Sequence, residues 1–331
     1  MLKKIAICGA TGVVGHETLR CLKETNFPVG KLSLFSSEKS AGKKIKTPFG
    51  ENTIKLFNVK DAQEHDFIFL CVGGRFSKEY AKKLTEKGSI VIDNSSAFRY
   101  DNDIPLVIPE INPETAKGHK LIANPNCTTA ILAVALYPIY KEFGLKKVII
   151  STYQATSGAG YEAMLELKEQ TKNYLEDKKV ENKNFGYPIP FNLIPQIDVF
   201  QENDYTKEEM KVVWETRKIF GNFDLKISCT AVRIPTFRAH AESVTIETEK
   251  PVNIRKIREI LEKSSGIKVV DDTVNLKYPM PLTATEQFDT EVGRIRKNDV
   301  FGDYGLDFFV CGDQLLKGAA LNTVQIAHLF I

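Results

Sequence analysis

The sequence predicts an α/β protein, in which an N-terminal Rossmann-type doubly wound parallel sheet is joined to a second domain of α+β type. Three observations support this fold class. Strand-like and helix-like segments alternate over residues 1–125. A glycine-rich turn separates the first strand-like segment from the first helical one. After Cys127, long strand-like segments follow that need not be parallel.

Short apolar segments predict the strands of the first domain. Helical spacing of apolar residues predicts helices over 13–25 and 75–88, the second of which is closed by Gly88. The alternation indicates a parallel sheet with helices on both faces. The predicted strands are 3–9, 31–35, 66–72, 89–95 and 120–125.

The second half carries longer elements. Thr206, with Glu209 three residues later, is a typical capping box at the start of a helix. Three prolines within 185–198 argue against regular structure there. We expect the last helix to pack back on the first domain. The predicted helices are 128–140, 161–183, 206–221 and 317–330, and the predicted strands are 145–154, 225–237, 241–249 and 305–312.

Composition excludes several classes of protein. The net charge of +3 over 331 residues gives no reason to expect a nucleic-acid or membrane-surface partner. The six cysteines form no CxxC pair and no zinc-binding spacing, so we expect no metal and a reduced, cytoplasmic protein. No signal peptide opens the chain, and no apolar run approaches the roughly 20 residues of a membrane span.

The stretch "GATGVVG" places Gly9, Gly12 and Gly15 directly after a predicted strand and at the start of a helix. Glycines allow the backbone to approach a pyrophosphate, and the helix N-terminus attracts its negative charge. This context favours dinucleotide binding over a glycine-rich turn in an unrelated α/β domain.

The end of the second strand indicates which dinucleotide binds. An NAD site usually has an acidic residue there, which binds the ribose diol. This chain has Ser36 and Ser37, with Glu38 slightly late and Lys39 after it. Hydroxyl groups and a cation suit a 2′-phosphate, so NADP (NADPH) is favoured over NAD.

Cys127 follows Asn-Pro-Asn and begins a predicted helix. A cysteine in an apolar segment is commonly a buried small hydrophobe. At a helix start, however, the dipole and the N–H groups stabilise a thiolate and an oxyanion, and Asn126 adds a side-chain donor. A nucleophilic thiol beside a nicotinamide indicates hydride exchange between an aldehyde and a thioester.

Such chemistry needs an acid or base, and the chain has five histidines. His240 stands out because charged residues, Arg233, Arg238 and Glu242, surround it in the sequence. A lone histidine is more often structural than catalytic. In this setting His240 is a candidate to take the proton of the thiol or hemithioacetal and return it later.

Nine separated stretches resemble one family, the bacterial aspartate-β-semialdehyde dehydrogenases. They are "GATGVVG", "DNSSAFR", "VIPEIN", "ANPNCTT", "QATSGAG", "NLIPQID", "EEMKVVWETRKI", "RIPTFRAHAES" and "KGAALNTVQIA". The resemblance spans nearly the whole chain. It implies a homodimer, an NADP-binding domain at 1–126 plus 313–331, and a catalytic and dimerisation domain at 127–312.

The resemblance also implies roles for individual residues. Cys127 is the implied nucleophile, His240 the acid/base and Gln154 the residue that orients the acyl intermediate. The implied phosphate-binding residues are Arg99, Asn126 and Lys211, while Arg233 binds the substrate carboxylate and Glu208 its ammonium group. The implied cofactor contacts are Gly9, Thr11, Gly12, Val13, Val14, Ser36, Ser37, Lys39, Ser40, Ser157, Gly158 and Gln314.

Local reasoning alone assigns some of these residues differently. Glu208 and Lys211 are three apart on a helix, which is typical of a solvated surface pair. Arg99 by itself is typical of a surface residue. The chain also departs from the family, which often has Arg at the position of Lys39 and small residues at Arg75 and Phe76. A lysine stacks less well on adenine than an arginine and cannot form the same pair of hydrogen bonds to a 2′-phosphate. We therefore expect a weaker preference for NADP over NAD.

The expected activity is reduction of L-aspartyl-4-phosphate to L-aspartate-4-semialdehyde by NADPH, which feeds lysine (through diaminopimelate), methionine and threonine synthesis. The nearest alternative is N-acetyl-γ-glutamyl-phosphate reductase, which needs no receptor for a free ammonium group. A glyceraldehyde-phosphate dehydrogenase would have an acidic residue directly after its second strand, where this chain has Ser36 and Ser37. A non-catalytic nucleotide-binding relative would lack the thiol, the histidine or the arginines, and all of these are present.

Overall fold

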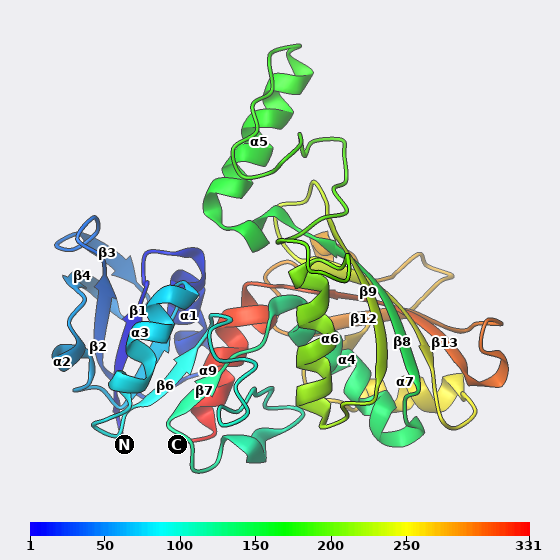
Figure 1. The fold of residues 1–331 in the computed structure, drawn as a ribbon, viewed down its shortest axis with the longest axis horizontal. Helices are drawn as coiled ribbons and strands as arrows, with labels where there is room; N and C mark the ends of the chain where they lie inside the picture. The colour runs from blue at the N-terminus through cyan, green and yellow to red at the C-terminus, as the bar shows by residue number, and fades with distance from the viewer. The chain divides into compact units, whose positions relative to one another are not determined.

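The computed structural model describes residues 1–331, which form two compact units, residues 1–126 with 319–331 and residues 127–318 (Figure 1). Each unit contains its own sheet. No helix of the chain is both long and apolar enough to cross a membrane.

The first unit is built on a seven-stranded sheet with the order β3-β4-β2-β1-β5-β6-β7. All neighbouring pairs are parallel except β3 with β4, an antiparallel hairpin at one edge. The central strands β1, β5 and β6 are buried at nearly every position, as a sheet covered on both faces requires. The strands are β1 (Lys3–Cys8), β2 (Val29–Ser36), β3 (Lys44–Thr47), β4 (Gly50–Leu56), β5 (Phe67–Leu70), β6 (Ile90–Asp93) and β7 (Leu121–Ala123).

The last helix of the chain belongs to this unit, as the sequence predicts. It contacts α1 and β6, and its Asn322 side chain donates a hydrogen bond to Asn124 Oδ1 at 2.7 Å. Phe27 and His328 pack edge to face with ring centroids 5.0 Å apart. The helices of the unit are α1 (Val13–Glu24), α2 (Val59–Ala62), α3 (Gly74–Leu84), the short η1 (Pro113–Ala116) and α9 (Leu321–His328).

The second unit is built on a mixed six-stranded sheet with the order β11-β12-β13-β10-β8-β9. β8 and β9 run parallel, whereas β10 is antiparallel to both β8 and β13, which confirms the predicted α+β character. The strands are β8 (Lys147–Gln154), β9 (Lys226–Arg233), β10 (His240–Glu247), β11 (Ile267–Val269), β12 (Thr290–Lys297) and β13 (Gly305–Gly312).

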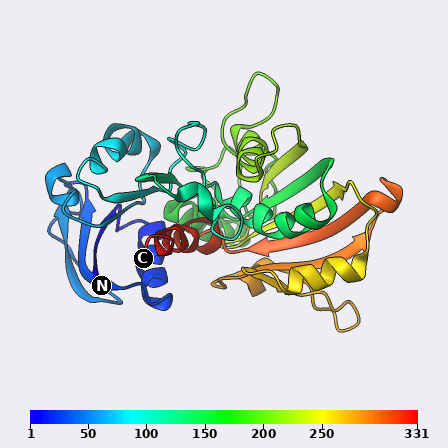
Figure 2. The ribbon, with the colours of Figure 1, turned by 90° about the horizontal axis from the view of Figure 1, so that it is seen from below.

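Three helices of this unit, α4 (Cys127–Phe143), α6 (Lys207–Phe220) and α7 (Ile254–Glu262), pack against the sheet. Figure 2 shows the yellow helix α7 alongside the orange strands, and α7 contacts β11 and β12. Helix α5 (Tyr161–Leu175) projects away from the sheet (Figure 1). The remaining helical segments are η2 (Thr156–Ala159), α8 (Pro281–Ala284), η3 (Gly302–Tyr304) and η4 (Leu316–Ala320), the last of which crosses the boundary between the two units.

Two predicted helices are shorter than expected. The helix predicted over 161–183 ends at Leu175, because the chain turns back and the Glu166 carboxylate accepts hydrogen bonds from the Lys183 and Asn184 amides at 2.9 and 2.6 Å. The helix predicted over 75–88 ends at Leu84, and a turn leads to Gly88, which has a φ of +94°.

Candidate active site

A cysteine at the start of the second unit's sequence and a histidine 113 residues later meet at the carboxyl end of β8. Helix α4 begins at Cys127 and strand β10 begins at His240, and Cys127 Sγ lies 3.5 Å from His240 Nε2. The sulfur therefore lies at the positive end of the α4 dipole. This contact joins the two residues that the sequence singles out as nucleophile and acid/base.

The surroundings of His240 define its protonation. The Ala155 amide donates a hydrogen bond to Nδ1 at 3.1 Å, so the proton of the neutral ring lies on Nε2, facing the sulfur. Burial, and then the charge of Arg233, lower the pKa of His240 to about 3. The imidazole is therefore neutral and is placed as a hydrogen-bond donor to a thiolate or to an oxyanion formed beside it.

Gln154 and Arg233 lie side by side, because the parallel strands β8 and β9 pair in a register that ends with these two residues. The Arg233 guanidinium is buried and donates to the Ala155 carbonyl at 2.6 Å. A Cβ atom on Gly158 would lie 2.9 Å from Arg233 Nη1 and 3.3 Å from His240 Nε2. The turn after β8 thus passes tightly over both functional groups.

Helix α6 contributes an acidic and a basic side chain. Its capping box forms as predicted, with the Thr206 amide donating to Glu209 Oε2 at 2.6 Å. Glu208 is buried and accepts a hydrogen bond from Gln154 Nε2 at 3.2 Å. The Lys211 ammonium lies 2.9 Å from Glu208 Oε2 and 2.8 Å from Asp198 Oδ2.

The reading of Glu208 and Lys211 as a solvated surface pair is therefore wrong. Burial alone would lower the pKa of Lys211, but the carboxylates of Glu208 and Asp198 outweigh it and raise that pKa. The lysine stays charged in a partly buried site. The carboxylates of Glu208 and Asp198 and the ammonium group of Lys211 can therefore bind a substrate that carries both positive and negative charges.

The first unit holds the glycine-rich turn. Gly9 has a φ of +85°, and a Cβ atom there would lie 2.2 Å from the Cys71 carbonyl oxygen, so only glycine fits. Helix α1 follows with Gly12 at its N-cap, no side-chain cap and no acidic residue in its first turn. The helix N-terminus is thus suited to a phosphate.

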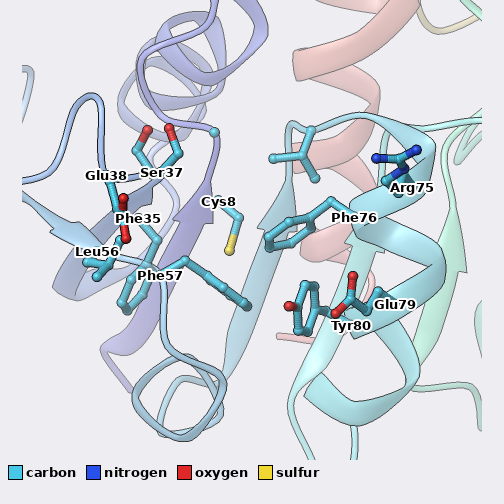
Figure 3. Close-up of a pocket in the computed structure, with 13 residues that line it drawn as sticks. Cys8, Phe35, Ser37, Glu38, Leu56, Phe57, Arg75, Phe76, Glu79 and Tyr80 are labelled. Carbon is cyan, nitrogen blue, oxygen red and sulfur yellow. The ribbon is translucent and has the colours of Figure 1, made fainter.

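A cavity of about 580 Å³ adjoins this turn (Figure 3). Its aromatic wall is made by Phe57, Phe76 and Tyr80, whose ring centroids lie 4.6 to 5.0 Å apart. In Figure 3, Ser37 and Glu38 lie on one side of the cavity and Arg75 on the other. An apolar cavity beside a glycine-rich turn at a helix N-terminus has the character that the adenosine part of a dinucleotide needs.

The predicted cofactor residues divide among three places. Ser36, Ser37 and Gly9 line the cavity. Ser157, Gly158 and Gln314 lie in the second unit, around the turn that covers His240. The others lie on the glycine-rich turn, in the first turn of α1 or on the loop after β2 and do not line the cavity, namely Thr11, Gly12, Val13, Val14, Lys39 and Ser40.

Arg99 and Asn126 belong to the first unit, and Asn126 directly precedes Cys127. Arg99 is buried, and its guanidinium donates to the Asn124 and Asn94 carbonyls, each at 2.8 Å. The reading of Arg99 as a surface residue is therefore wrong. The other cations and anions of the predicted substrate site, Glu208, Lys211 and Arg233, lie in the second unit with Cys127 and His240.

Sequence reasoning missed several residues of these sites. Arg75 and Phe76 stand out in the sequence only as departures from the family, yet both line the cavity. Ala155, whose amide fixes the His240 ring, acts through its backbone and leaves no signal in the sequence. Asp313 accepts hydrogen bonds from Arg238 Nε and the Glu286 amide at 2.6 and 2.7 Å. Its position next to Gln314 was the available signal.

Glu242 is a fully buried carboxyl on β10, two residues beyond His240 and without a hydrogen-bond partner. Burial raises its pKa well above the usual value, so it is protonated in the folded protein. The unfolded chain releases this proton above about pH 4.3. The contribution of Glu242 to the free energy of unfolding is therefore greatest below that pH and falls as the pH rises toward the folded-state pKa.

We expect Glu242→Gln to become progressively more stable than the native protein as the pH rises. The difference in unfolding free energy should grow by about 1.4 kcal/mol per pH unit above about pH 5, because glutamine has no proton to lose. Urea unfolding at several pH values measures this. Glu262→Gln, at an exposed position on α7, is the control and should show no such slope. An equal slope in both variants would contradict a buried, protonated Glu242.

Comparison with known proteins places this geometry in a family. Residues 4–119 match the model of the semialdehyde dehydrogenase NAD binding domain, and residues 136–317 match that of the semialdehyde dehydrogenase dimerisation domain. The aspartate-semialdehyde dehydrogenase of Aquifex aeolicus is 47% identical over 99% of this chain and 98% of that protein.

Solved structures agree. The crystal structure of aspartate semialdehyde dehydrogenase II from Vibrio cholerae has a TM-score of 0.95 at 41% identity, covering 100% of this chain and 98% of that one. A structure of the same enzyme complexed with ASA has a TM-score of 0.94, also at 41% identity, with the same coverage of 100% and 98%.

Proposed function

Because this chain belongs to the aspartate-semialdehyde dehydrogenase family, whose members are oxidoreductases of amino-acid biosynthesis, we propose that it reduces L-aspartyl-4-phosphate through a thioester on Cys127. The single observation that supports this mechanism is the 3.5 Å contact between Cys127 Sγ and His240 Nε2 at the start of helix α4. The product is L-aspartate-4-semialdehyde, an intermediate on the way to lysine, methionine and threonine.

In this proposal the Cys127 thiol loses its proton to solvent and the resulting thiolate attacks the acyl carbon, so that a C–S bond forms and the C–O bond to phosphate breaks. The tetrahedral oxyanion of each step forms next to His240 Nε2–H, which donates a hydrogen bond to it. After hydride addition to the thioester, the C–S bond breaks and returns the thiolate. The departing phosphate takes its proton from solvent, so His240 need not leave its neutral form, which the low pKa favours.

The remaining residues hold the substrate. Arg233 offers two parallel N–H groups to the α-carboxylate and Glu208 a carboxylate to the α-ammonium group. Gln154, hydrogen-bonded to Glu208, is placed to orient the acyl group. Lys211, Arg99 and Asn126 are the proposed ligands of the phosphate. The charges of an amino-acid acyl phosphate are thus met by opposite charges.

NADP is the proposed cofactor, and its nicotinamide supplies the hydride when bound. The glycine-rich turn at Gly9 and the N-terminus of α1 would hold the pyrophosphate. Ser36 and Ser37 line the adenosine cavity and can donate to a 2′-phosphate. Lys39 does not line the cavity, whereas Arg75 does, so Arg75 is the proposed cation for this phosphate. The Glu38 carboxylate also lines the cavity and would repel a 2′-phosphate.

Replacing Arg75 tests this preference without a turnover assay. We expect Arg75→Gln to weaken binding of adenosine 2′,5′-bisphosphate about tenfold and to leave adenosine 5′-phosphate within about twofold, because a charge-assisted hydrogen bond is lost only with the former. Isothermal titration calorimetry measures both. Lys78→Gln, on the same helix but outside the cavity, is the matched control. Equal weakening of both nucleotides would show that Arg75 does not read the 2′-phosphate.

We further propose that the first unit is the NADP-binding domain and the second the catalytic and dimerisation domain of a homodimer. One sheet face of the second unit supports this, because Ile149 on β8 is 46% exposed and Tyr153 and Phe309 are only partly buried. These apolar side chains suit contact with a second copy. Six free cysteines suit a reducing, cytoplasmic location.

The substrate separates this proposal from its nearest alternative. With phosphate and NADP present, L-aspartate-4-semialdehyde should raise the absorbance of reduced nicotinamide, and N-acetylglutamate semialdehyde should give at most about one-hundredth of that rate. The buried Glu208 carboxylate has no ammonium group to bind in the acetylated compound. Comparable rates with both aldehydes would contradict the proposed substrate.

A further inference from the structure

The residue directly before His240 has an unusual backbone conformation. Ala239 has a φ of +65°, in the left-handed region where a Cβ atom is crowded by the backbone. Such a conformation persists only when the surrounding structure holds it. Ala239 is fully buried, and it sets the direction in which the His240 side chain leaves the chain.

Gln314, which follows β13, supplies such a restraint. Its side-chain Oε1 accepts a hydrogen bond from the Ala239 amide at 2.8 Å, and its Nε2 donates to Ser157 Oγ. The Gln314 side chain is only 2% exposed. Both ends of one buried amide are therefore engaged by two different segments of the chain.

Both segments support the imidazole. Ser157 lies in the turn that carries Ala155, whose amide donates to His240 Nδ1 at 3.1 Å. A Cβ atom on Gly158, the next residue, would lie 3.3 Å from the imidazole ring. Ala239 is the covalent neighbour of His240 on the other side. Gln314 thus connects the turn that orients the imidazole ring with the backbone of Ala239, from which the His240 side chain starts.

The neighbouring Asp313 anchors this connection. Its buried carboxylate accepts from Arg238 Nε at 2.6 Å and from the Leu315 amide at 2.9 Å. Residues 313–314 therefore hold residues 238–239 at two successive positions. The support of His240 rests on a segment about 75 residues away in the sequence.

We propose that Gln314 is a positioning residue for His240, which keeps Nε2–H directed at the Cys127 sulfur by fixing Ala239 and the 155–158 turn together. This inference rests on the proposed pairing of Cys127 with His240. It differs from the role that family resemblance implies for Gln314, which is contact with the cofactor.

Alkylation of Cys127 by iodoacetamide tests the proposal in the protein without cofactor. Gln314→Met keeps the side-chain length and removes both hydrogen bonds. We expect the pH midpoint of alkylation to rise by about half to one unit, because a less well directed Nε2–H stabilises the thiolate less. Mass spectrometry distinguishes alkylation of Cys127 from alkylation of buried thiols such as Cys229. Burial raises the pKa of the Cys229 thiol. Arg233 and Glu208, whose charges act on the pKa of His240, are unchanged in each variant.

Two further variants separate positioning from general damage. In an Ala239→Gly background the Gln314→Met shift should be less than half as large, because glycine adopts a positive φ without strain. Gln170→Met is the matched control. Gln170 is equally buried, accepts from the Ile189 amide at 3.0 Å and donates to the Glu181 carbonyl at 2.8 Å, but it lies on α5. This control should lower the melting temperature and leave the alkylation midpoint in place.

The outcomes distinguish this inference from the proposed function. If His240→Gln shifts the midpoint and Gln314→Met does not, Gln314 does not position His240, and a weaker affinity for NADP alone would identify it as a cofactor contact. If His240→Gln leaves the midpoint unchanged, the pairing itself fails and this inference with it. Should Gln314→Met not fold, Ser157→Ala removes one of the two bonds and must give a smaller shift of the same sign.

Discussion

Cys127→Ala is expected to reduce the phosphate-dependent reduction of NADP by L-aspartate-4-semialdehyde by a factor of about 10,000 or more. No other group at the site can form the acyl intermediate. The five remaining cysteines do not lie at the start of α4, and burial raises the pKa of Cys8, Cys71, Cys229 and Cys311. The rate is measured from the absorbance of reduced nicotinamide.

The control for this loss is Cys229→Ala, a buried thiol on β9 in the same unit. It should keep its activity within about threefold of the native enzyme, because a small cavity lowers the free energy of unfolding but leaves the reacting groups in place. Binding of NADP to the Cys127→Ala protein should be unchanged within about threefold, which shows that the fold is intact. Residual activity above about one per cent in a protein free of wild-type enzyme would rule out the thioester route.

His240→Gln is expected to lower kcat by about 100- to 10,000-fold with a smaller change in KM. The imidazole faces the sulfur at 3.5 Å and donates to charge that develops during the reaction, so its loss affects the transition state more than substrate binding. Because burial and Arg233 hold the pKa of His240 at about 3, the native enzyme should show no loss of activity on lowering the pH through 6.5, the ordinary value for histidine.

His119→Gln, a partly exposed histidine of the first unit, is the matched control and should leave kcat within about twofold. An acid limb near pH 6.5 that disappears in His240→Gln would mean that the imidazole titrates normally. That result would contradict a neutral His240 that donates from Nε2–H. Pre-steady-state measurement of phosphate release separates acylation from hydride transfer in both variants.

Most of the core elements followed from local patterns. The buried strands β1, β5 and β6 are short apolar runs bounded by polar residues, and α6 has a capping box, so each carries its own signal. The hairpin strands β3 and β4 carry no clear signal, because only Ile54 among their residues is buried and most of their residues are polar or charged. Helix α7 does carry a signal, with Asn253 as its cap and Ile257 and Leu261 buried, which went unassigned.

The site divides in the same way. The glycine-rich turn and the turn that carries Cys127 can be recognised from short stretches of sequence, because each lies between the end of a strand and the start of a helix. Glu208, Lys211 and Arg99 by themselves are typical of a solvated surface. In the fold, α6 packs against β9 and α4 and Glu208 is buried, while the carbonyls of Asn94 and Asn124, which follow β6 and β7, bind the buried Arg99 guanidinium.

By itself the sequence determined the alternating core strands and helices of the first unit, the glycine turn at Gly9 and the placement of a thiol where α4 begins, since periodicity, caps and glycine conformations act between near neighbours. The tertiary structure alone decided that Cys127 meets a histidine 113 residues away and that the Ala155 amide selects its tautomer. Those contacts depend on the register of β8, β9 and β10. Register is set by how whole faces of the sheet pack, which no short stretch of residues encodes.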